Sequence, residues 1–401
     1  MLLNRSNGNP DFNTEFSFSV SRAGDYLLQS WLRVTIPAIT VSSSATDCYV
    51  AWTPLLMHAL VNNVSINFND LSAHRLTNFD LDFISAFSTP AGKLDGYNEM
   101  IANVSSMTTP AKSLPEYTGI LPIPLFYSDD TGVALPCASL PYNEIRIQFK
   151  FRDWKDLLTT YVLGSDGVTM TPRTVVESDL ETTPSLNNNV ALWANYAIVG
   201  NEQRREMGSG TQDMVIKQHQ FSPTSNFTPS TNQYQTFDVR FSHSVVALFF
   251  AVRNNSVPSV WSNYTTESAT VTMGTDSNVD IEYSPGKSPV EHVSLVYENS
   301  HRLSQLPADY YTHVQPYYQP QAIIPTHLPG VKMYSYALDF VDLDSSGSTN
   351  FGKLSNVSLI TEASPAAITA ADAGAKYQMV ITCQNRNLIR VAGGALGFPH
   401  I

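Results

Sequence analysis

Residues 143–152 read NEIRIQFKFR, and this stretch decides the class of fold. Apolar side chains occupy every second position from Ile145 to Phe151, and charged or amide side chains stand between them. Successive side chains of a β-strand point to opposite faces of its sheet. The alternation therefore predicts a strand that is buried on one face only.

The same alternation recurs at residues 15–21, 236–242 and 376–383. Prolines and clusters of Ser, Thr, Asn and Gly separate these runs from shorter β-favouring ones at 26–36, 64–68, 192–199, 245–252, 293–297, 334–340 and 388–392. Many short strands with turn residues between them indicate antiparallel sandwiches. We therefore predict an all-β chain, with short helices in its loops at 55–60, 79–87, 92–102 and 201–207.

The length of 401 residues suits two domains of about 200 residues each. A Gly-Ser-Gly sequence and a polar, proline-containing stretch lie near the middle. The predicted division is a first sandwich at 1–208, a linker at 209–230 and a second sandwich at 231–401. Residues 159–189 and 265–291 are polar and are predicted to be long exposed loops.

Charged residues make up 14 % of the chain, against about 25 % in an average soluble protein. Two explanations stay open: much of the surface is covered by other copies or partners, or a compact monomer is coated with Ser, Thr and Asn. The net charge is −12 and no run of Lys or Arg occurs, which argues against direct binding of nucleic acid.

Three cysteines, Cys48, Cys137 and Cys383, lie far apart and form no CxxC motif. This argues against a disulfide framework and a thiolate zinc site, and it fits a reducing compartment. The N-terminus lacks the apolar core of a signal peptide, and no apolar run is long enough to cross a membrane. We expect a chain that is neither secreted nor membrane-spanning.

The sequence from Asp342 to Gly347, DLDSSG, is similar to the front half of a calcium-binding loop. Such a loop needs a carboxylate at its twelfth position, where this chain has Lys353, and it needs flanking helices, where 334–340 alternates like a strand. We predict a turn that follows a strand.

Other chemical motifs are missing from the sequence. The nine histidines form no HExxH or HxH, and neither GxSxG nor a P-loop occurs. Acidic pairs stand at Asp80/Asp82 and at Asp129/Asp130, the second of which is predicted to be a hairpin turn. We therefore predict no catalytic, cofactor-binding or metal-binding residue, and no enzyme activity.

The alternative is a β-sandwich protein that binds or cleaves carbohydrate. It would need paired carboxylates in a groove or an aromatic platform. The tryptophans are spread along the chain and are predicted to be core anchors: Trp31, Trp52, Trp154, Trp193 and Trp261.

Several long stretches, taken together and in order, resemble one family: residues 21–33, 121–146, 240–264, 294–299, 334–340, 347–356 and 389–399. They are similar to the major capsid proteins of iridoviruses, within the nucleocytoplasmic large DNA viruses. The resemblance runs through essentially the whole chain. It implies two consecutive eight-stranded jelly rolls, which agrees with the two all-β halves.

The resemblance also implies a function and a location. Subunits of this family form homotrimers, which are pseudo-hexagonal capsomers that tile an icosahedral shell over an internal membrane. The implied partners are other copies, minor capsid proteins and viral membrane proteins beneath the shell, with no cofactor and no direct contact with nucleic acid. The implied location is the virion, after assembly in the host cytoplasm.

One signature and two departures follow from the same resemblance. Gly347, Asn350, Phe351 and Asn356 belong to a family signature and are expected to fix a loop between jelly-roll strands. Asp129 stands where relatives often carry a basic residue, so contacts at that turn are expected to differ. Met1 stands almost at the first strand, where relatives carry a longer arm that joins neighbouring capsomers.

Overall fold

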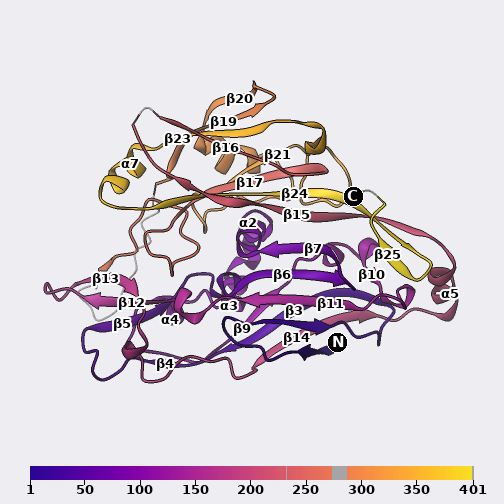
Figure 1. The fold of residues 1–401 in the computed structure, drawn as a ribbon, viewed down its shortest axis with the longest axis horizontal. Helices are drawn as coiled ribbons and strands as arrows, with labels where there is room; N and C mark the ends of the chain where they lie inside the picture. Colours follow the sequence, from indigo (N-terminus) through magenta and orange to yellow (C-terminus); the bar gives the residue numbers. More distant parts are fainter. Residues whose placement is uncertain (232, 273–286, 400–401) are drawn as a thin grey trace.

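The computed structural model describes residues 1–231, 233–272 and 287–399. Within these residues the strands form five antiparallel sheets, and the larger ones build two β-sandwiches that are stacked on each other (Figure 1). No helix in the described part of the chain is long and apolar enough to cross a membrane.

The first sandwich is a nine-stranded sheet that doubles back on itself at strand β1 (Leu2–Asn7). Leu2–Asn4 pairs with β14, and Arg5–Asn7 pairs with β2. One layer contains β14 (Val190–Ala197), β3 (Tyr26–Ile36), β9 (Tyr117–Pro122) and β10 (Leu135–Pro136); the other contains β2 (Glu15–Ser19), β11 (Ile145–Phe151), β6 (Val61–Phe68) and β7 (Leu71–Thr77).

The stretch that predicted the fold class is strand β11, and its alternation is confirmed. The four apolar side chains, Ile145 to Phe151, are buried, and the residues between them are exposed or half-buried. The Phe16 ring of β2 lies against two of these side chains, with centroids 5.8 Å from Phe149 and 4.7 Å from Phe151. Every second side chain along these strands thus points inward and builds the core between the layers.

The second sandwich has a six-stranded and a four-stranded sheet. The first contains β15 (Gln212–Phe227), β24 (Tyr377–Ala392), β17 (Ser244–Asn254), β21 (Lys332–Ser335), β22 (Thr349–Asn350) and β25 (Ala395–Gly397). The second contains β16 (Tyr234–Asp238), β23 (Val357–Ala363), β19 (Val290–Tyr297) and β20 (Ser300–Pro307).

Strand β17 is buried along nearly its whole length because both of its faces are covered. Leu248 and Phe250 belong to the core of the second sandwich, whereas Ala247 and Phe249 belong to the core that continues into the first. A continuous apolar run is what a strand with two covered faces requires.

Helix α2 (Asn78–Ser88) lies between the two sandwiches (Figure 1). Thr77 starts this helix as its N-cap, and the Asp80 carboxylate accepts hydrogen bonds from the Thr77 backbone and hydroxyl groups. We call the surface between the sandwiches the seam; it is formed by β7 and α2 on one side and by β15, β17, β24 and residues 258–265 on the other.

The remaining elements are short. The other α-helices are α1 (Leu56–Leu60), α3 (Leu94–Met100), α4 (Ser105–Thr108), α5 (Asn201–Ser209), α6 (Gln315–Tyr317) and α7 (Pro365–Asp372). One small sheet contains β18 (Val271–Thr272), β13 (Thr169–Thr174), β12 (Leu158–Leu163) and β5 (Cys48–Trp52). Another pairs β4 (Ile39–Thr40) with β8 (Ser113–Leu114). The predicted helices at 55–60, 79–87, 92–102 and 201–207 correspond to α1, α2, α3 and α5.

Several sequence predictions need correction. Most of the expected linker at 209–230 is strand β15, which pairs with β24 from Gln212 to Phe227. The expected loop at 159–189 holds β12 and β13. Asp129 and Asp130 lie between two short 3₁₀ helices, Phe126–Ser128 and Thr131–Val133, and not in a hairpin. Of the loop at 265–291, residues 273–286 lie outside the described residues.

Candidate functional site

A buried hydrogen-bond network occupies the centre of the seam, on α1, α2 and the loop that contains Tyr264. The carboxylate of Asp82 lies 2.8 Å from Nδ1 of His58, and it accepts hydrogen bonds from the hydroxyls of Ser262 at 2.9 Å and Tyr264 at 2.7 Å. The other ring nitrogen of His58, Nε2, lies 2.7 Å from the Tyr97 hydroxyl. The network therefore joins residues 182 positions apart in the sequence.

The line from Asp82 through His58 to Tyr97 has the order of a proton relay, and its two inner members lie away from solvent. His58 and Asp82 are fully buried. Burial, with a smaller contribution from the Asp82 charge, raises the pKa of both the Tyr97 and the Tyr264 hydroxyls. These hydroxyls stay protonated and serve as donors, so the network holds the two sandwiches together.

The indole ring of Trp261 lies between two guanidinium groups beside this network. The Arg152 guanidinium carbon lies 3.7 Å from the ring centroid, and that of Arg253 lies 3.9 Å from it. Burial lowers the pKa of Arg152 to about 9 and that of Arg253 to about 10. Both cations still bind carbonyl groups, and their stacking on Trp261 adds cation–π attraction across the seam.

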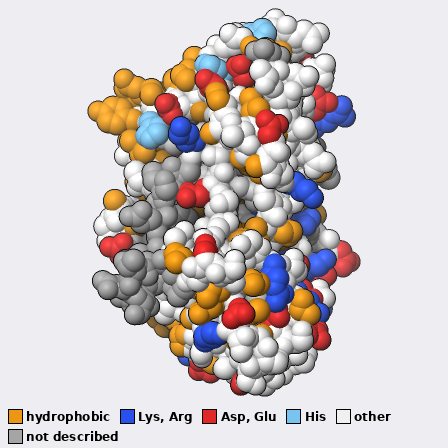
Figure 2. Space-filling model, turned by 90° about the vertical axis from the view of Figure 1, so that its left-hand side faces the viewer, with side chains coloured by type: hydrophobic (Ala, Val, Ile, Leu, Met, Phe, Trp, Pro, Cys, Tyr) orange, Lys and Arg blue, Asp and Glu red, His pale blue; other side chains and the backbone are white. Residues whose placement is uncertain are grey.

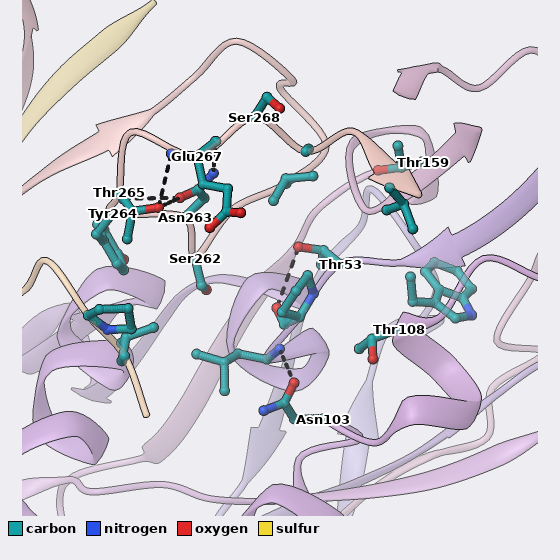
Figure 3. A pocket seen from close by; sticks show the side chains of 18 of the residues that line it. Thr53, Asn103, Thr108, Thr159, Ser262, Asn263, Tyr264, Thr265, Glu267 and Ser268 are labelled. Atoms are coloured by element: carbon teal, nitrogen blue, oxygen red, sulfur yellow. Dashed lines mark hydrogen bonds between the residues drawn. The ribbon is translucent and has the colours of Figure 1, made fainter. Parts of the chain in front are cut away.

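A cavity of about 410 Å³ lies beside this network, and Ser262 and Tyr264 are among its lining residues (Figure 3). Its walls come from both sandwiches and include Trp52, Tyr161, Val271 and Leu328. Many of its polar groups already bind each other: Thr53 accepts a hydrogen bond from the Trp261 backbone, and the Asn263 amide donates to the Glu267 carbonyl.

This cavity does not meet the requirement of a glycosidase. Among its described lining residues Glu267 is the one carboxylate, and burial raises its pKa. Hydrolysis of a glycosidic bond uses two carboxyl groups about 5–9 Å apart. Of the predicted tryptophan anchors, Trp52 and Trp154 are buried, and Trp31, Trp193 and Trp261 are half-buried. No observation here favours the carbohydrate alternative.

The loop expected to be a family signature joins β22 to β23. Phe351 is buried, and its ring contacts Phe241, Tyr297 and Tyr336, with centroids 6.0–6.3 Å away. Asn350 caps the short 3₁₀ helix Phe351–Lys353 by accepting a hydrogen bond from the Gly352 amide at 3.0 Å.

The other two residues of that signature meet the backbone of neighbouring strands. Gly347 has φ +155°, and a Cβ at this position would lie 2.5 Å from the Tyr336 carbonyl oxygen. The Asn356 carbonyl accepts a hydrogen bond from the Glu298 amide at 2.9 Å. Gly347 and Phe351 thus share a neighbour, Tyr336, whereas Asn356 meets the turn between β19 and β20.

The acidic stretch that is similar to a calcium loop already binds a cation of the chain itself. The Arg386 guanidinium donates to the carbonyl oxygens of Asp342 at 3.1 Å and Asp344 at 2.6 Å. In the described ranges no group of three or more metal-binding side chains occurs. These carbonyls are therefore committed to Arg386.

The surface carries few charges. On the side shown in Figure 2, most of the surface is neither apolar nor charged; apolar side chains gather at the upper left, and charged side chains are scattered over the rest. The most exposed large apolar side chains include Tyr317, Tyr318 and Leu338, at 73 %, 76 % and 77 %. The Gln319 amide donates to the Ala337 carbonyl, which joins the two loops that carry these side chains.

Comparison with known families and sequences gives a consistent result. The family model described as large eukaryotic DNA virus major capsid protein matches residues 203–397, and the one described as major capsid protein N-terminus matches residues 2–199. The chain is 47 % identical to the major capsid protein of Invertebrate iridescent virus 3, with 99 % of the chain and 88 % of that protein covered. It is 40 % identical to the one of Lymphocystis disease virus 1, with 100 % and 89 % covered.

Solved structures agree with the fold. A quasi-atomic model of the PBCV-1 virus capsid matches with a TM-score of 0.78 at 18 % identity, covering 100 % of this chain and 96 % of that one. The Faustovirus major capsid protein matches with a TM-score of 0.76 at 12 % identity, covering 98 % and 90 %. The prediction of two consecutive jelly rolls is confirmed.

Proposed function

The chain belongs to the major capsid protein family of large eukaryotic DNA viruses, and we propose that three copies of it associate into a pseudo-hexagonal capsomer. Its relatives among the iridoviruses are shell proteins, and its location is the capsid of the virion. In the proposed assembly the chain acts through its shape and catalyses no reaction.

The observation that carries this proposal is the rigid pairing of two jelly rolls in one chain. The seam joins them through a shared apolar core and through the Asp82 network, so one subunit supplies two blocks at a fixed distance. Three such subunits supply six blocks, which is the number that a hexagonal outline needs. The low charge content and the exposed Tyr317, Tyr318 and Leu338 fit surfaces that other copies cover.

The division of the chain is part of the same proposal. We place the first jelly roll before α5 and the second from β15 onward, with α5 as the connection. The two family models, which meet between residues 199 and 203, support this division.

We also propose a wider assembly built from these capsomers. The capsomers tile an icosahedral shell over an internal membrane, with minor capsid proteins and membrane proteins as further partners. A net charge of −12 without a basic run fits a shell that does not touch the viral DNA. Three buried, unpaired cysteines fit assembly in the reducing host cytoplasm.

Light scattering on the purified chain tests the first step. We expect a mass of three times 44.2 kDa and roughly hexagonal particles in electron micrographs. A stable monomer at micromolar concentration contradicts the trimer. Cryo-electron tomography of virions checks the membrane, because the proposal requires a lipid layer directly beneath the shell.

A further inference from the structure

A pair of histidines crosses the seam at a second place, away from the Asp82 network. His74 on β7 and His219 on β15 stack with ring centroids 5.3 Å apart and an angle of 16° between the rings. Nε2 of His74 lies 3.1 Å from Nδ1 of His219. His74 is buried, and His219 is half-buried with its Nε2 atom buried.

The contacts of the pair fix where each proton lies. Nδ1 of His74 accepts a hydrogen bond from the Phe126 amide at 3.1 Å, so the proton of neutral His74 is on Nε2. That proton is donated to Nδ1 of His219, whose own proton is then on Nε2, where it has no partner. Each nitrogen that could take a further proton, Nδ1 of His74 and Nδ1 of His219, thus already accepts a hydrogen bond.

We propose that this pair makes the seam an acid-sensitive joint, which is closed while both imidazoles are neutral and loosens when either is protonated. A proton added to Nδ1 of His74 would face the Phe126 N–H, and one added to Nδ1 of His219 would face the His74 N–H. In both cases a donor meets a donor, the hydrogen bond is lost, and the two jelly rolls lose contact there.

The neighbouring groups add little that could neutralise such a charge. The strand partners of the pair are uncharged: Ile66 on β6 pairs with His74, and Gln384 on β24 pairs with His219. The Lys217 charge opposes protonation of His219, and the Lys217 ammonium lies 3.3 Å from the Asp129 carboxylate.

The sign of the pH dependence follows from burial. Burial lowers the pKa of His74 to about 3 and lowers that of His219 well below its usual 6.5. Below pH 6.5 an opened chain therefore binds protons that the closed seam cannot, and stability is lost as the pH falls from 6.5. At pH 5 the protonation of His74 in the opened chain raises the unfolding equilibrium constant by about 30-fold, and His219 acts in the same direction.

Asp80 on α2 acts in the opposite direction. Burial raises its pKa to about 6, so acid relieves the cost of its buried charge. This lowers the unfolding constant by about 10-fold at pH 5. The net effect of the three groups is a loss of stability in acid.

The test is urea unfolding of the full chain at pH 7.5 and pH 5.0. His219→Asn keeps an acceptor for the His74 proton but does not titrate. We expect the acid-induced rise in its unfolding constant to be smaller by a factor of up to about 30, the limit set by a histidine that titrates near 6.5 in the opened chain. His301→Asn, at an exposed position on β20, is the matched control and should keep the full rise. An equal acid response in His219→Asn and in the unmodified chain overturns the proposal.

Hydrogen exchange on the unmodified chain gives a second, independent measurement. After correction for the intrinsic pH effect, amides of β7 and β15 should lose protection at pH 5.0 before those of β11 and β19. Uniform loss over the four strands overturns the proposal. Both histidines belong to one chain, so light scattering at both pH values separates opening of the seam from dissociation of the trimer.

Discussion

Phe83 of α2 stacks on Phe249 of β17, with ring centroids 6.2 Å apart and an interplanar angle of 20°. This contact brings the core of the first jelly roll directly onto a strand of the second. The next turn of α2 adds Phe87, 5.8 Å from the same ring. The two jelly rolls therefore share apolar surface and are expected to unfold together.

Phe249→Ala tests this shared core. The loss of a large buried ring should lower the free energy of unfolding by about 3–5 kcal/mol, as measured with urea. Phe250→Ala is the matched variant, because its ring lies on the opposite face of β17 against Tyr311. It should cost a similar amount and leave the seam amides of β7 protected from exchange. A loss below about 1 kcal/mol for Phe249→Ala would contradict a shared core.

Asp82→Ala removes the acceptor that His58, Ser262 and Tyr264 share. The buried donors are left without a partner, so we expect a loss of about 3–5 kcal/mol in the free energy of unfolding. Asp95→Ala, on the exposed side of α3, should change it by less than about 0.5 kcal/mol. Equal melting temperatures for the two variants would rule out a structural role for the network.

Gly347→Ala places a methyl group against the Tyr336 carbonyl at a φ of +155°. We expect a loss of about 1–3 kcal/mol in thermal or urea unfolding. Gly208→Ala is the control: it lies in helix α5, where a Cβ meets nothing, and should stabilise the chain by about 0.5–1 kcal/mol. If both variants are neutral, the signature loop tolerates a side chain at Gly347.

Asn350→Ala removes the cap of the 3₁₀ helix that follows it. The expected cost is about 0.5–2 kcal/mol, seen as a lower melting temperature or a lower yield of trimer. Calcium should not change the melting temperature, because Lys353 stands where a calcium loop needs a carboxylate and the Arg386 guanidinium, bound to the Asp342 and Asp344 backbone carbonyls, already places a positive charge at this stretch. A calcium-dependent increase that disappears in Asp342→Ala would restore the metal-site interpretation.

Lys332→Met should stabilise the chain, and by less as the pH rises. Lys332 is fully buried, with a hydrogen bond to the Gly330 carbonyl at 2.9 Å, and burial lowers its pKa to about 7. Between pH 7 and 10.5 the unfolded chain binds more protons than the folded one, so stability of the unmodified chain rises with pH there.

Removing the amine should therefore raise the free energy of unfolding by about 2–4 kcal/mol at pH 7 and by little near pH 10, as measured with urea. Lys353→Met, at an exposed position, serves as the control and should show no such pH-dependent gain. A pH-independent effect of Lys332→Met would mean that the ammonium is solvated in the folded chain.

The strands that the sequence predicted best are those with one solvent-facing side and one buried side, such as β11 and β2. Strand β15 was mistaken for a linker because its sequence, from Gln212 to Phe227, is mostly polar and contains a proline. Some of these polar side chains have tertiary partners: Gln218 donates to the Ala73 carbonyl across the seam, and Gln220 binds Ser242. Such burial depends on tertiary contacts and leaves no alternation to detect.

The seam network was equally hidden from sequence reasoning. Asp82 was noticed only as the neighbour of Asp80, and His58 as one of nine scattered histidines. Their partner Tyr264 lies in the other half of the chain, so no spacing motif connects the three. The resemblance to a capsid family predicted two jelly rolls but could not predict which side chains join them.

Strand β1 has a consequence for a protein that must crowd with its own copies. Because Leu2–Asn4 pairs with β14 and Arg5–Asn7 with β2, one strand covers an edge of each layer. Free strand edges recruit further strands and start aggregation. Sharing β1 leaves two fewer such edges. Copies can therefore reach a high local concentration and meet through side chains, as an ordered lattice requires, without pairing strand to strand.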